Sequence, residues 1–106
     1  MKVFNSQICT SREQSERLLA LGLKKETADM AIEPDLESTY EVYYISAYPP
    51  SKRGVPAWSL HRLICLIFNS GSAHVDLFED DDAYEILIYN IEWRIKEGYF
   101  NEEYLV

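Results

Sequence analysis

The sequence predicts an α+β fold in which three main helices pack on a small antiparallel sheet of two to three strands. Apolar residues recur at three- and four-residue spacing, the period of one helix face, over residues 60–68 and 84–95. Residues 40–48 are rich in aromatic and β-branched side chains and contain no Gly or Pro, a composition typical of strands. Hydrophobic residues make up 47% of the 106-residue chain, enough for one packed core. We therefore expect a single globular domain over residues 1–106.

A first helix is expected over residues 11–21. The Thr10 hydroxyl can cap the first turn while the Glu13 side chain reaches back to the Thr10 backbone, the reciprocal capping-box arrangement. Leu18 follows at helical spacing, and Gly22 supplies the left-handed conformation that ends many helices.

The middle of the chain is expected to change from helix to strand. Residues 25–30 can form one or two further helical turns, because Pro34 forbids a longer helix. The predicted strand at 40–48 ends at Pro49, and an exposed basic loop follows over residues 51–54.

Two longer helices are expected in the second half. Pro56 is assigned to the first turn of one, where its missing N–H costs nothing, and that helix ends near residues 69–72. A short strand is expected at 74–78. The acidic residues 79–82 lead into the last helix, which stops at Gly98. One core is expected from the apolar faces of the three helices: Leu18, Leu21, Leu60, Leu63, Ile64, Ile67, Leu87, Ile88, Ile91 and Ile95.

The charge of the chain argues against two classes of partner. Asp and Glu number 18 against 10 Lys and Arg, a formal net charge of −8, whereas nucleic acids are bound by neutralising phosphates with basic residues. No apolar run has the length that crosses a bilayer, and residues 1–6 lack the apolar region of a secretory signal. We expect a cytoplasmic protein, without direct nucleic-acid or membrane binding, whose Cys9 and Cys65 are free thiols.

Three stretches of the chain carry a resemblance to known sequences. They are residues 13–23 running on to 27–30, residues 56–60, and residues 91–93 followed by 96–101. Together they resemble a group of small proteins of gut Bacteroidetes genomes, their phages and mobile elements, for which no activity is assigned. The resemblance implies a common fold and a mobile-element origin, and it transfers no catalytic residue.

A zinc site is considered first among the chemical constellations. His61 and Cys65 lie four residues apart on one helix face, and His74 with Asp76 could complete a tetrahedral site. Short zinc-binding chains usually carry two close-spaced ligand pairs, and Cys65 borders the apolar stripe. We therefore interpret Cys65 as a small core residue and expect no bound metal.

The remaining polar clusters are interpreted as structural. Residues 79–82 lack the spaced ligands and central Gly of a calcium loop, and fit a helix cap. The acidic residues within 33–37 are expected in a solvated loop. Ser59 and His61, two residues apart on a helix, point to different sides, and the four glycines are isolated. No catalytic residue and no cofactor is therefore assigned.

The tyrosine-rich strand is the candidate interface. Tyr43 and Ile45 are expected on one of its faces and three other tyrosines on the opposite face, so one side can remain partly uncovered. Tyr and Trp give large contact area at low entropy cost, so such a face suits a protein partner or a second copy. Trp58 either joins this surface or caps the core. The candidate interface residues are Tyr40, Tyr44, Tyr48 and Trp58.

These observations favour a small non-catalytic protein-binding or accessory module, acting with a protein partner or as a homo-oligomer. The alternative is an acidic inhibitor that occupies a basic nucleic-acid-binding groove of a host protein. A small enzyme with an unrecognised site is the third hypothesis. An acidic face joining residues 79–82 to 33–37 or 102–103 would favour the inhibitor, and a deep pocket holding His61 or His74 beside a carboxylate would favour the enzyme.

Overall fold

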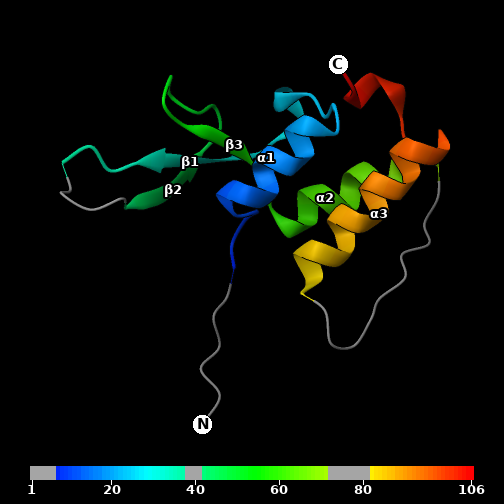
Figure 1. Cartoon of the computed structure of the whole chain (residues 1–106), viewed down its shortest axis with the longest axis horizontal. Coiled ribbons are helices and arrows are strands. Elements are labelled where there is room, and N and C mark those ends of the chain that lie inside the picture. The colour runs from blue at the N-terminus through cyan, green and yellow to red at the C-terminus, as the bar shows by residue number, and fades with distance from the viewer. Residues whose placement is uncertain (1–6, 38–41, 72–81) are drawn as a thin grey trace, which may run out of the picture.

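The computed structural model describes residues 7–37, 42–71 and 82–106. Within these ranges the chain forms three α-helices and a three-stranded antiparallel sheet, which confirms the predicted α+β class (Figure 1). The sheet projects to one side of the helices. The helices are α1 (Arg12–Ala20), α2 (Leu60–Phe68) and α3 (Ala83–Glu97).

The N-cap of helix α1 lies one residue later than expected. Ser11, not Thr10, is the N-cap: its hydroxyl accepts the Gln14 N–H, and the Gln14 side chain accepts the Ser11 N–H. The capping box thus uses Gln14 in place of Glu13. Thr10 is instead fully buried, where its hydroxyl accepts the Trp58 backbone N–H at 3.0 Å. The contact with Trp58 therefore uses the hydroxyl of Thr10, which the local sequence pattern had assigned to the helix cap.

The end of α1 matches the expectation. Gly22 has a φ of +99°, the left-handed region in which a side chain would be strained. Its N–H donates to the Leu19 carbonyl, and the Leu23 N–H donates to the Leu18 carbonyl at 3.2 Å. This pair of bonds is the Schellman arrangement, and the apolar contact that accompanies it joins Leu18 and Leu23 in the core.

The sheet has the strand order β2-β1-β3, and both pairs are antiparallel. The strands are β1 (Met30–Pro34), β2 (Tyr43–Ala47) and β3 (Val55–Ala57). Only β2 lies where the sequence predicts a strand. The expected strand at 74–78 is outside the described residues.

Two of these strands correct the sequence interpretation. After one short 3-10 turn, η1 (Lys25–Thr27), the chain enters β1 instead of continuing as helix. Pro56 lies in β3 and not in a helical turn. Pro56 lies opposite Ala31 in a pair that is not hydrogen-bonded, because the pairs on either side of it carry the hydrogen bonds between β1 and β3. The missing N–H of proline is therefore tolerated in this edge strand. Helix α2 starts at Leu60, after the Ser59 cap.

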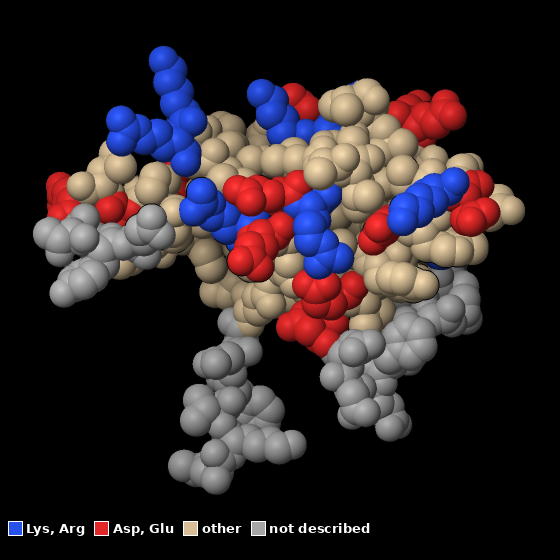
Figure 2. Space-filling view, in the orientation of Figure 1, with Lys and Arg blue, Asp and Glu red and all other residues tan. Residues whose placement is uncertain are grey.

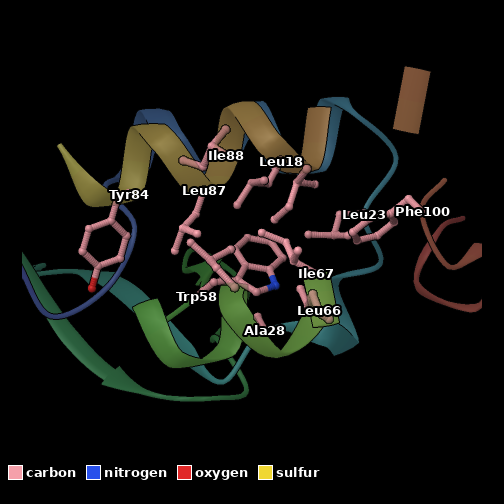
Figure 3. Packing of buried hydrophobic residues seen from close by; sticks show 12 residues of the cluster. Leu18, Leu23, Ala28, Trp58, Leu66, Ile67, Tyr84, Leu87, Ile88 and Phe100 are labelled. Carbon is pink, nitrogen blue, oxygen red and sulfur yellow. The ribbon is translucent and has the colours of Figure 1, made fainter. Parts of the chain in front are cut away.

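The main core lies between the helices, as Figure 3 shows for the residues around Trp58. Six of the ten predicted core residues are buried, and Leu21, Leu60, Ile64 and Ile95 are partly buried against them. The predicted helix faces are therefore confirmed. Leu66, which the predicted core omits, is also buried, and Phe68 at the end of α2 is half exposed.

Both ends of α3 agree with the expectation. The Asp82 side chain accepts the N–H groups of Tyr84 and Glu85, which confirms it as the cap, and Gly98 adopts a φ of +77°. Residues 79–81 lie outside the described part. The short turn η2 (Glu102–Tyr104) follows. No helix in the described ranges has the length and apolar character needed to span a membrane.

Candidate interaction surface

Strand β2 is an edge strand of the sheet, because among the described residues it pairs with β1 and with no other strand (Figure 1). Its side chains are exposed on both faces, to 39% for Tyr43, 54% for Tyr44 and 46% for Ile45. Proteins usually protect an edge strand with charged residues, proline, a bulge or a covering element. Residues 43–47 contain neither a charged residue nor a proline. Within the described part of the chain, this side of β2 can therefore accept another strand.

The backbone groups that face outward follow from the register of β2 on β1. The Asp35 N–H donates to the Val42 carbonyl at 2.7 Å, and the Tyr48 N–H donates to the Asp29 carbonyl at 3.4 Å. Even-numbered residues of β2 thus direct their backbone N–H and C=O groups toward β1, and odd-numbered residues direct theirs to the opposite side. The backbone N–H and C=O groups that point to the free edge are those of Tyr43, Ile45 and Ala47.

An apolar groove of about 300 Å³ lies beside this edge. Ile32, Tyr43 and Ile45 line it from the sheet, and the segment that leads into α1 lines the other side. Cys9, in this segment, is buried, and burial raises the pKa of its thiol. The Arg12 guanidinium lies 5.0 Å from the centroid of the Tyr43 ring and donates to its hydroxyl. Arg12 and Tyr43 thus meet at the rim of the groove.

The other face of the sheet is partly covered by the loop that follows β2. Glu33 on β1 is buried, and it accepts hydrogen bonds from the Ser51 hydroxyl and, at 2.7 Å, from the Ser51 N–H. These bonds hold the pKa of Glu33 below its ordinary value. Gly54 passes so close that a Cβ there would lie 2.7 Å from Glu33 Cδ. Glu33 was expected in a solvated loop, and its position in the central strand corrects that expectation.

The structure separates the four predicted interface residues. Tyr44 is exposed at the edge, and Tyr48 is half-buried against the main core. Tyr40 lies outside the described residues. Tyr43 and Ile45, which were not selected as interface residues, complete the exposed edge. Their signal was present in the sequence, because residues 43–45 leave no polar face for solvent.

Trp58 belongs to the core. Its side chain is fully buried among the helices, and its indole N–H donates to the Thr27 hydroxyl at 3.0 Å (Figure 3). Of its two possible roles, interface or core, the structure thus corrects the assignment to the interface. The buried indole fits because its one polar group has a partner.

Two of the residues that were considered as metal ligands are adjacent in space, and Cys65, which was expected in the core, is only partly buried. His61 Nε2 and Cys65 Sγ are 3.5 Å apart on one side of α2. His74 and Asp76 lie outside the described residues. In the part of the chain that is described, no group of three or more His, Cys, Asp or Glu side chains is placed to hold a metal ion.

Carboxylates and basic groups are interleaved on the face shown in Figure 2. Arg17 Nη1 lies 2.8 Å from Glu85 Oε2, and α1 carries a further pair in Arg12 and Glu16. The hydrogen bond from Gln14, followed by that from Arg17, lowers the pKa of Glu85. The acidic stretches 33–37 and 102–103 lie at opposite ends of the view in Figure 1.

Comparisons of the chain with protein families, curated proteins and solved structures found no match. The resemblance to the Bacteroidetes group stays a prediction from the sequence. The β2 edge and its groove are the features from which we infer a function.

Proposed function

We propose that this chain is a small non-catalytic protein-binding module that binds an extended segment along the free edge of β2. The observation that carries the proposal is the exposure of Tyr43, Tyr44 and Ile45 on a strand whose outer backbone groups face away from the sheet. In strand addition, main-chain hydrogen bonds supply affinity and side-chain pockets supply specificity. The β2 edge offers both kinds of contact.

The groove beside β2 supports this mode of binding. A strand paired with β2 directs alternate side chains to the face that carries Ile32 and Ile45. An apolar side chain of the partner would bury its surface there, next to the aromatic ring of Tyr43. We therefore expect an extended segment with an apolar residue at alternate positions, flanked by an acceptor for Arg12.

The proposal is tested by site-specific crosslinking in the native cell. A photo-crosslinking residue at position 45, in a chain tagged after Val106, should capture a partner. The same residue at Glu97, an exposed position at the end of α3, should not capture that partner. Equal capture from both positions, or no capture from position 45, would contradict the proposal.

A substitution pair provides the matched control. Ile45→Lys places a charge in the expected contact, whereas Leu36→Lys makes the same change at an exposed position outside β2. We expect Ile45→Lys to reduce partner recovery about tenfold or more, and Leu36→Lys to leave it unchanged. Circular dichroism should show that both variants remain folded. Unchanged recovery with folded Ile45→Lys would exclude the β2 edge as the binding surface.

A further inference from the structure

We infer that a second copy of this chain can occupy the β2 edge, paired antiparallel with it about a twofold axis at Ile45. This inference rests on the proposed function, because it assumes that the edge accepts a strand. The outward backbone groups of β2 belong to Tyr43, Ile45 and Ala47. A twofold axis at Ile45 sets Ile45 opposite its counterpart and Tyr43 opposite Ala47, so outward groups meet outward groups.

The register decides which side chains of β2 face one another across the two copies. Bulky residues occupy the first half of the strand and small residues the second half. Pairing about Ile45 therefore places Tyr43 opposite Ala47 on one face and Tyr44 opposite Ser46 on the other. Ile45 then lies directly opposite Ile45 of the second copy, and each Tyr43 ring lies diagonally across from that isoleucine, within the reach of an aromatic side chain.

Other registers pair fewer residues of β2 with one another. Moving the axis to Tyr44 keeps outward groups opposite one another but sets Tyr44 against itself and Tyr43 against Ile45. It also leaves Ser46 and Ala47 without partners inside the strand. Only the axis at Ile45 pairs all residues of Tyr43–Ala47 with one another. The absence of charge in this segment removes a repulsion that two copies of a chain with net charge −8 would otherwise meet.

The position of the sheet permits the contact. Figure 1 shows the strands projecting away from α2 and α3, with β2 on the outer side of β1. Two copies would thus join their sheets into one continuous sheet. The contact is a single short strand with few side chains, so we expect a weak dimer whose population rises with protein concentration.

A charge-swap experiment tests both the partner and the register. Ile45→Lys and Ile45→Glu are prepared separately, and the molar mass of each is measured by sedimentation over a range of concentrations. Each variant alone should have a dimer dissociation constant about tenfold or more above that of wild type, because like charges face each other across the axis. An equimolar mixture should recover the dimer, because Lys then faces Glu. Leu36→Lys, outside β2, should dimerise as wild type does.

Each result decides the inference. A wild type that sediments as a monomer at the highest concentration would overturn it, as would a mixture that fails to dimerise while both variants are folded. Position-45 crosslinks to a different protein from a monomeric wild type would also overturn it. That last outcome leaves the proposed strand-binding function standing, so the two failures are distinguishable.

Discussion

Ile91 on α3 is fully buried in the main core, which makes it the residue at which the helix packing is best tested. Truncation to alanine removes apolar contacts and leaves a cavity. We expect Ile91→Ala to lower the free energy of unfolding by about 2–5 kcal/mol, measured by denaturant titration. Tyr89→Ala, at an exposed position on the same helix, should change it by less than about 0.5 kcal/mol. Equal effects would mean that the buried face of α3 is misassigned.

The side chain of Glu85 makes the stability of the fold depend on pH. The Gln14 amide donates to Glu85 Oε1 at 2.8 Å, and Arg17 donates to both carboxylate oxygens. These contacts hold the folded-state pKa of Glu85 below its unfolded value. The group therefore stabilises the fold above the unfolded pKa, and this contribution is lost as the pH falls through the folded pKa.

The corresponding test compares Glu85→Gln with wild type across pH. The variant should be less stable at neutral pH, and the difference should shrink as the solution is acidified. The effect should be modest, because the carboxylate is about half exposed to solvent. Glu13→Gln, on the exposed side of α1, is the control. A stability gap at Glu85 that does not change with pH would contradict the linkage.

At the scale of the element, the start of α3 is capped by the side chain of Asp82. Asp82 Oδ1 accepts the Tyr84 N–H at 2.7 Å and the Glu85 N–H at 3.4 Å. Removing the acceptor leaves free N–H groups at the start of the helix. We expect Asp82→Ala to destabilise the protein by about 0.5–2 kcal/mol in thermal or denaturant unfolding. Asp82→Asn keeps the acceptor and should recover most of the loss. Similar losses in both variants would assign the effect to charge and not to capping.

At the scale of the whole molecule, we expect folding without metal. The main core joins all three helices through apolar side chains, and its one buried indole N–H is satisfied by Thr27. Such a core needs no metal ligand to close it. The melting temperature should therefore be the same with and without a strong chelator. A large decrease, with stoichiometric zinc in the native sample, would assign a structural role to His61 and Cys65.

Features that depend on short-range chemistry were predictable from the sequence. Gly22 and Gly98 end helices because each supplies a positive φ, and Asp82 begins one because its carboxylate reaches N–H groups two and three residues away. The buried faces of the helices follow from apolar spacing. The β2 strand follows from its composition. In each case the interacting groups lie within a few residues of one another.

Features that depend on distant neighbours became visible in the fold and not in the sequence. Met30–Pro34 is a strand because β2 and β3 satisfy it from both sides, and Pro56 is tolerated beside it because its nitrogen faces an edge. Thr10 does not cap α1, because its hydroxyl binds the backbone of Trp58, 48 positions away. The candidate surface also depends on the fold, because the strand order places β2 at the edge of the sheet. The sequence of β2 does not specify that order. Burial and strand pairing are properties of contacts between remote segments, so composition and spacing alone do not specify them.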